Sequence, residues 1–268
     1  MSGLTGGKVL WGGNTHQFIS KIAFDLSGIP NDVVGTNRTI RAPADQDTRF
    51  STTIHEGDTI SDILVQHSTD PDLFAIPVLW QIEHGAIPLT RTGHAPYEAQ
   101  RFVNNGLSYK ERDLQNLYLS WGIHYLEDTG MPYHTTLDPI IQSTHYQIED
   151  YIDRNLMKYE AQVRTAVPKP VKNMYIEGWN LAEYVNPYAY LMYEAWAKKD
   201  YRMLDEIAVE TLKATVASVA GAIQNFNTLY NVVAQPFGFP TVLVFSVPIV
   251  GIALAYRKEK HPVYQLQK

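Results

Sequence analysis

The stretch HYLEDTGMPYHTTLDPIIQSTHYQIE, residues 124–149, carries the pattern from which both the fold and the function of this chain can be predicted. His124 and Asp128 stand four residues apart, and His145 and Glu149 repeat that spacing. On a helix, residues at i and i+4 project from the same face, so the two side chains of each pair can reach one cation. The sequence therefore predicts two adjacent helices, each with a pair of possible metal ligands.

A third histidine, His134, lies between the two pairs, just after a Gly-Met-Pro break. A single histidine four residues from an acid is more often a surface hydrogen bond than a metal site. Here the three histidines and the two paired acids, Asp128 and Glu149, fall within 26 residues, on or beside apolar helical stripes. Buried charge is costly in such places unless it is paired or metal-bound. The cluster therefore favours a metal centre that holds two cations.

Apolar residues at helical spacing predict a mainly α fold. The clearest helix spans 114–129 and ends at Gly130 and Pro132. Its apolar face is formed by Leu114, Leu117, Tyr118, Trp121 and Tyr125. The next helix, of about six turns, carries Ile140, Ile141, Ile148, Ile152 and Leu156.

Weaker patterns predict the remaining helices and one long loop. An N-terminal helix is expected after a cap at Asn14 or Thr15. Residues 28–62 are predicted to be a loop, and no convincing alternating strand pattern is found. Further helices are expected near 72–84, 97–105, 178–197 and 201–231. The sequence thus predicts a bundle of seven or so helices.

The overall composition limits the chemistry that the chain can use. The 268 residues are 45% hydrophobic and 19% charged, which is typical of a globular protein. A net charge of −6 disfavours broad wrapping by nucleic acid, since counterion release requires a basic surface. The chain has no cysteine, so His, Asp and Glu are the metal ligands that it can offer.

The C-terminal region has the composition of a membrane span. No charged residue occurs from Ala214 to Tyr256, and Phe237–Tyr256 is mainly apolar. Twenty residues at ~1.5 Å rise cross a bilayer core of ~30 Å. The alternative is a buried helix. The domains predicted are a helical domain at 1–235, a transmembrane helix at 236–257 and a basic tail at 258–268.

The charges that flank the apolar segment predict its orientation. Arg257, Lys258 and Lys260 follow it directly, which places the C-terminus in the cytoplasm. The helical domain is then expected to be membrane-anchored and extracytoplasmic. No secretory signal is visible at the N-terminus, and that observation conflicts with this topology.

The central stretch resembles the signature of the zinc-dependent phospholipases C, His-Tyr-x-x-Asp-x-x-x-Pro-x-His. It is read here from His124 to His134, and the pair His145 and Glu149 matches the second ligand pair of that family. The segment WGGNTH, residues 11–16, resembles the start of the related single-strand-specific zinc nucleases.

The segment GDTISDILVQH, residues 57–67, also resembles bacterial members of the family. Ser61 stands where those members usually have proline. The matches follow the family order and cover its ligand positions. The resemblance therefore implies the helical fold of this family.

The resemblance also implies a role for each matched residue. It implies three zinc sites, with the ligand sets His67, His124 and Asp128; His134, His145 and Glu149; and His16, Asp128 as a bridge and the backbone of Trp11. Asp62 would orient or deprotonate the attacking water. Two alternatives stay open: His94 could replace His67, and Asp58 could replace Asp62.

The start of the chain departs from the family pattern. In the family the tryptophan is the mature N-terminus and its free α-amine binds zinc, whereas ten residues precede Trp11 here. Either these residues are removed or the third site lacks its amine. The expected zinc content is therefore two to three ions.

Three functions are compatible with these observations. The first is a phospholipase C-like phosphodiesterase, for which the apolar C-terminal segment favours a phospholipid or another phosphodiester at a surface. The second is a single-strand nuclease, for which aromatic residues that stack on bases are expected. The aromatic row from Tyr184 to Trp196 is interpreted as helix core instead. The third is a catalytically reduced accessory subunit of a membrane protein complex, since bound metal also contributes to folding.

Overall fold

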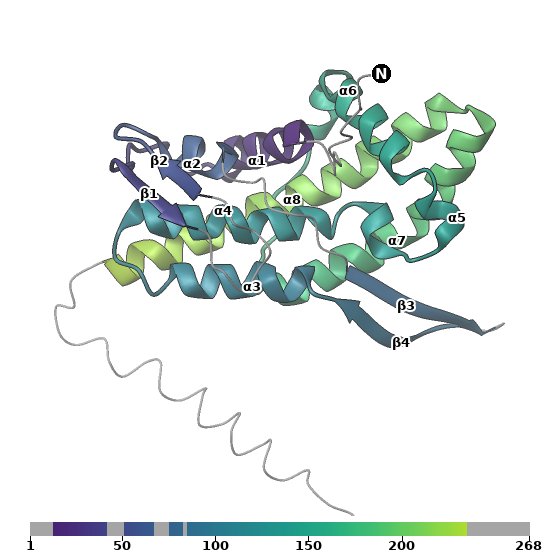
Figure 1. Ribbon diagram of the computed structural model, residues 1–268, viewed down its shortest axis with the longest axis horizontal. Helices are drawn as coiled ribbons and strands as arrows, with labels where there is room; N and C mark the ends of the chain where they lie inside the picture. The colour runs from purple at the N-terminus through teal and green to yellow at the C-terminus, as the bar shows by residue number, and fades with distance from the viewer. Residues whose placement is uncertain (1–12, 42–50, 67–74, 83–84, 235–268) are drawn as a thin grey trace, which may run out of the picture. The chain divides into compact units, whose positions relative to one another are not determined.

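The computed structural model of the chain describes residues 13–41, 51–66, 75–82 and 85–234. Most of these residues are helical, which confirms the prediction of a mainly α fold (Figure 1). The helices in these ranges are α1 (Gly13–Ser27), α2 (Ile60–Gln66), α3 (Ala95–Gly106), α4 (Arg112–Asp128), the 3-10 helix η1 (Pro132–Thr135), α5 (Pro139–Gln142), α6 (His145–Val163), α7 (Met174–Lys198) and α8 (Tyr201–Ala234).

Helix α4 is the central element. All of its residues from Asp113 to Asp128 are buried. This burial follows from the packing of α3 along one side of α4 and from contacts with α1, α2 and α7 (Figure 1). Leu117 and Trp121 belong to the hydrophobic core. Because the helix is enclosed, its polar side chains need partners inside the protein.

The segment predicted as one six-turn helix is in two parts, α5 and α6. The side-chain amide of Gln142 donates to the carbonyls of Tyr133 and Thr136, at 2.6 and 2.8 Å. These bonds tie α5 to the turn that precedes it, so the chain reorients before α6 begins at His145. The four-residue spacing of His145 and Glu149 thus falls in the first turns of a new helix.

The two long helices near the C-terminal end of the described chain are confirmed, with α7 beginning at Met174 and α8 extending to Ala234. The aromatic row of α7 is only partly core, so its interpretation as core needs correction. Tyr184 and Tyr190 are 46% and 55% exposed, and their hydroxyls donate to Glu210 and Glu194.

The expectation that the chain lacks strands is wrong. Residues 28–62, predicted as loop, contain β1 (Arg38–Arg41) and β2 (Ser51–Ile54), which pair antiparallel, and the start of α2. Residues 75–82 within the predicted helix 72–84 form strand β3 (Ala75–Ile82), paired antiparallel with β4 (Gly85–Gly93). A short apolar run rich in branched and aromatic residues fits either structure, and here the pairing with β4 decides it.

The chain divides into two units, Met1–Val232 and Val233–Lys268, and the site described below belongs to the first. The predicted membrane span at 236–257 and the basic tail at 258–268 lie outside the described residues. Within the described ranges, every helix is too short or too polar to cross a bilayer.

Candidate metal centre

Four helical elements bring the site together. Helix α1 carries His16, α4 carries His124 and Asp128, η1 carries His134, and α6 carries His145 and Glu149. The first turn of α1 is fixed to α6, because the side chains of Asn14 and Thr15 donate to the carboxylate of Asp153, at 2.8 and 3.0 Å. Since Asp153 lies one turn after Glu149, this contact fixes α1 close to the ligand-type residues of α6.

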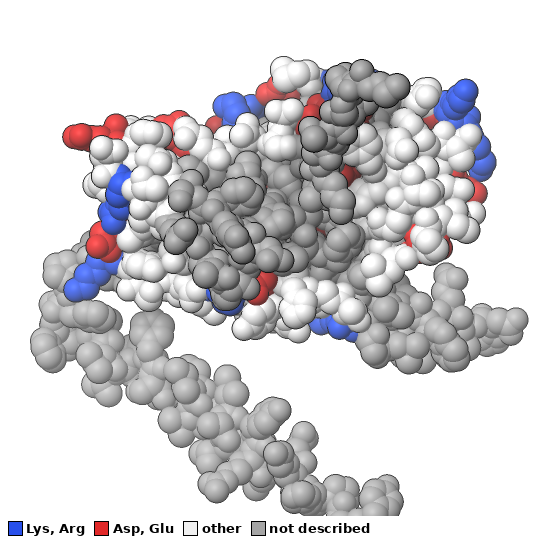
Figure 2. Space-filling view, in the orientation of Figure 1, with Lys and Arg blue, Asp and Glu red and all other residues white. Residues whose placement is uncertain are grey.

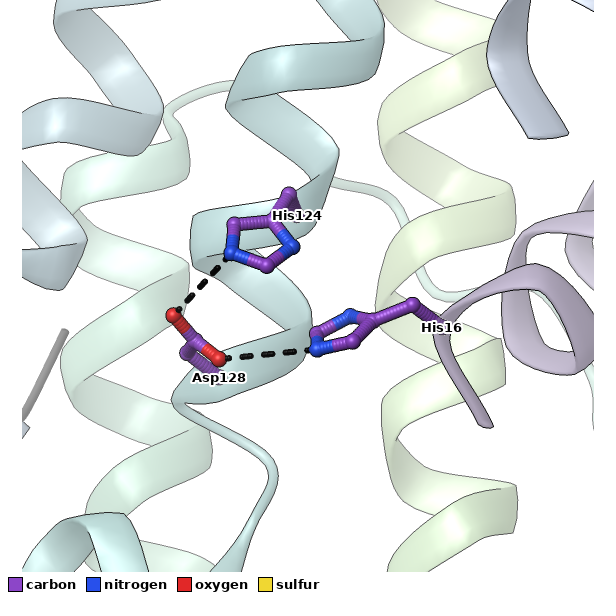
Figure 3. Close-up of side chains that lie close together, drawn as sticks. All are labelled: His16, His124 and Asp128. Carbon is purple, nitrogen blue, oxygen red and sulfur yellow. Dashed lines mark ion pairs between the residues drawn. The ribbon is translucent and has the colours of Figure 1, made fainter. Parts of the chain in front are cut away.

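The first group consists of His16, His124 and Asp128. Each residue offers one ligand atom, and these atoms lie within 4.8 Å of one another. Nε2 of His16 is 3.8 Å from Oδ1 of Asp128, and Nε2 of His124 is 3.7 Å from Oδ2 (Figure 3). The side chains are at most 2% exposed. Two imidazoles and a carboxylate thus converge in the protein interior from two helices.

The second group consists of His134, His145 and Glu149, whose ligand atoms also lie within 4.8 Å of one another. Oε1 of Glu149 is 2.7 Å from Nε2 of His145 and 3.4 Å from Nε2 of His134. His134 and Glu149 are buried, but the side chain of His145 is 13% exposed. The second group therefore has a side that solvent can reach.

Burial and hydrogen bonding act in opposite directions on Glu149. Burial favours the neutral carboxyl, whereas hydrogen bonds and positive charge from His134 and His145 favour the carboxylate. The second effect prevails, and the pKa of Glu149 lies below its ordinary value. Glu149 is therefore ionised at neutral pH, which is the state that a metal ligand requires.

Glu127 also belongs to this region, although the sequence reading missed it. Its Oε2 is 2.6 Å from Nδ1 of His16, and its Oε1 accepts a hydrogen bond of 2.7 Å from the Ser20 hydroxyl. Burial raises the pKa of Glu127, and the bonds from His16 and Ser20 partly offset that effect. A sequence signal existed: Glu127 lies on a helix with apolar residues on several faces, including Ile123 and Leu126.

Gln142 is the corresponding neighbour of the second group, and it was also missed. Its Oε1 lies 2.9 Å from Nδ1 of His145. Its amide nitrogen donates to two backbone carbonyls, so Oε1 is the atom that accepts from His145. Each group thus contains a histidine whose Nδ1 is held by a neighbouring oxygen.

Asp62 lies in the first turn of α2 and belongs to neither group among the described residues. Its Oδ2 accepts hydrogen bonds from the backbone N–H and the hydroxyl of Thr59, at 2.9 and 2.7 Å. These bonds lower the pKa of Asp62, so the group is a carboxylate at neutral pH. Its observed contacts are those of a helix cap, and its catalytic role stays a prediction.

Trp11 and His67 lie outside the described residues. The end of α2 is held against α4, because the Ser120 hydroxyl donates to the Leu64 carbonyl at 2.9 Å, one turn before His124.

The structure also places the two alternative residues. His94 is exposed at the N-terminus of α3, and Asp58 accepts a hydrogen bond from the backbone N–H of His55 at 2.8 Å. Neither belongs to a ligand group among the described residues.

The donor atoms fit a divalent cation. Each group offers two imidazole nitrogens and a carboxylate oxygen, which are the ligands that zinc accepts in the absence of thiolates. Both groups are largely buried, and the two carboxylates offset part of the charge that a cation would bring. These side chains can therefore hold metal ions. No family model, curated protein or solved structure matches this chain at a significant level.

Proposed function

We propose that this chain is a zinc-dependent phosphoric diester hydrolase of the phospholipase C-like type. The observation that carries the proposal is the convergence of two largely buried groups, each with two histidines and one carboxylate. The first of them joins His16 to residues more than 100 positions away in the sequence. The motif from His124 to Glu149 and its resemblance to the zinc-dependent phospholipases C support the choice of zinc and of phosphodiesters.

The described residues would supply the ligands for at least two ions. His134, His145 and Glu149 would hold one ion. His16, His124 and Asp128 would contribute to the remaining one or two, with His67 and the backbone of Trp11 as further ligands. When bound, zinc supplies a Lewis acid that activates water and stabilises charge on phosphate oxygens.

The roles of the protein groups follow from their environments. Hydrogen bonds lower the pKa values of Glu149 and Asp62 and so stabilise both groups as carboxylates. Asp62 would accept a proton from water through Oδ1, since Oδ2 already accepts two hydrogen bonds from Thr59. A phosphate ester would approach from the side of His145, the most exposed member of the two groups.

A phospholipid is the substrate class that we favour. The sequence of segment 237–256 is mainly apolar, and such a segment would anchor the domain at a membrane surface. On the face shown in Figure 2, the Lys and Arg side chains of the described residues are scattered among Asp and Glu, with no basic stripe. A nuclease that binds single strands commonly has such a stripe.

The test uses the full chain in detergent, with and without zinc, and two substrates. Hydrolysis of a phosphocholine ester that EDTA abolishes, and that Glu149→Gln also abolishes, would support the proposal. Cleavage of single-stranded DNA alone would identify a nuclease. Zinc binding without either activity would identify an accessory subunit with a retained metal centre. Asp150→Asn, at the next position of the same helix, is the matched control, since it removes a charge that forms an ion pair with the exposed Arg154.

A further inference from the structure

Glu127 is a buried carboxylate beside the first group of ligand-type residues. It is 0% exposed. Both of its oxygens are bonded to α1: Oε2 lies 2.6 Å from Nδ1 of His16, and Oε1 accepts from the Ser20 hydroxyl at 2.7 Å. Because His16 and Ser20 are one turn apart, the two bonds fix the orientation of the carboxylate and of the imidazole together.

The contact decides which nitrogen of His16 faces the group. Nδ1 is engaged by Glu127, and Nε2 points toward Oδ1 of Asp128 at 3.8 Å (Figure 3). A histidine that binds a metal commonly donates its other ring N–H to a carboxylate, which fixes the tautomer and makes the ligating nitrogen more basic. The arrangement of His16 matches that pattern.

The charge of Glu127 also suits a cation. An ionised carboxylate in the interior is costly unless positive charge compensates it. Among the described residues, the partners of Glu127 are a histidine and a hydroxyl, and no Lys or Arg forms an ion pair with it. A divalent cation between His16 and Asp128 would have the Asp128 carboxylate beside it and the Glu127 carboxylate on the far side of the His16 ring, and the two negative charges would offset that of the cation.

We propose that Glu127, held by Ser20, is a positioning residue for a divalent cation bound by His16, His124 and Asp128. The inference rests on the metal binding of the proposed function and is independent of hydrolysis. It further implies that the two groups differ in zinc affinity. In the second group the side chain that contacts Nδ1 of a histidine, His145, is the neutral amide of Gln142. The group supported by a carboxylate is expected to bind zinc more tightly.

The experiment measures zinc affinity of the full chain by competition with a chelator, after metal removal. Glu127→Gln keeps the shape of the side chain and removes its charge. It should weaken one binding step about 10–100-fold and leave the other step unchanged. His16→Ala should weaken the same step. Gln142→Ala, the matched control, should weaken the step that His145→Ala affects.

Two further measurements separate positioning from a purely structural role. The spectrum of the Co²⁺-loaded chain should change in Glu127→Gln and in the milder variant Ser20→Ala. The gain in melting temperature on adding zinc should shrink in both variants. A variant that lowers the melting temperature equally with and without zinc would assign Glu127 a structural role and overturn the inference.

The remaining outcomes also decide between the two proposals. If the unchanged chain binds zinc and Glu127→Gln binds it with the same affinity and the same Co²⁺ spectrum, the inference is wrong and the proposed function stands. If the unchanged chain binds no zinc, both are wrong. If Glu127→Gln does not fold, Ser20→Ala decides by the same criteria.

Discussion

Oδ1 of Asp128 lies 3.4 Å from Nδ1 of His134, while Nε2 of His134 lies 3.4 Å from Oε1 of Glu149. The imidazole of His134 therefore lies between a carboxylate of the first group and a carboxylate of the second. The two groups therefore form one contiguous cluster of side chains. A substitution of Asp128 should alter metal binding in both groups.

Asp128→Asn should remove metal from the first group and weaken the second. The amide cannot supply the negative charge that a bridging ligand provides, and it alters the contact with His134. We expect zinc content to fall by at least one ion per chain, and phosphodiester hydrolysis to be lost. Metal analysis of the purified variant checks this. Full zinc content and unchanged turnover would show that the ligand roles are misassigned.

Removal of zinc should lower the melting temperature substantially. A ligand present at about 1,000 times its Kd stabilises the folded state by about 4 kcal/mol, or roughly 8–16 °C for a domain of this size. Thermal unfolding with EDTA, followed by added zinc, measures the effect. His134→Ala serves as the comparison, because it should lose the part of this gain that the second group contributes and keep the part that the first group contributes. An unchanged melting temperature would contradict a metal centre in the core.

Gly122 lies where α3 and α4 pack too closely to leave room for a side chain. A Cβ atom there would lie 2.8 Å from the Ala99 carbonyl and 2.8 Å from Cγ2 of Val103, both on α3. Gly122→Ala is therefore expected to cost about 1–3 kcal/mol of unfolding free energy through overpacking. Because His124 follows two residues later, zinc affinity should fall as well. Gly13→Ala, which meets nothing within 4 Å, is the control. Equal stability of the two variants would contradict the close packing of α3 on α4.

The Asp205 carboxylate should stabilise the folded protein at neutral pH and lose this effect in strong acid. Burial raises its pKa, but hydrogen bonds from Lys158, Tyr159 and Tyr151 more than offset this and lower it below 3.8. A lowered pKa gives stability that is present above the ordinary pKa and lost as the pH falls through the lowered value.

Asp205→Asn removes this dependence and should cost about 1 kcal/mol at pH 7, since the site is partly exposed. Denaturant unfolding of both proteins from pH 7 to pH 2 tests the prediction. The difference between the two should shrink toward the acid end. A constant difference across that range would show that the ionisation of Asp205 is not the cause.

The parts of the fold that the sequence predicts well are those with long, regular patterns. The apolar repeat from Leu114 to Tyr125 gives α4 to within a few residues, and α7 and α8 follow from similar repeats. The hairpin β3–β4 was missed because the eight residues of β3, which are mainly apolar, carry too little periodicity to exclude a helix. The break between α5 and α6 depends on side-chain bonds of Gln142 that no periodicity reveals.

In the candidate site, too, the local features are predicted from the sequence and the long-range contacts are not. The spacing of His124, Asp128, His145 and Glu149 on helices is a local property, and the structure brings these residues together with His134 as that spacing suggests. The approach of His16 from α1 needed the resemblance to a known family. Glu127 was missed because its role depends on a contact between residues 111 positions apart.

Metal content per chain, measured by mass spectrometry on the full chain purified without chelators, tests the metal centre most directly. We predict at least two zinc ions per chain in the unchanged protein, with one or more lost in Asp128→Asn. A chain that is folded, stable and free of bound metal would contradict the proposed function.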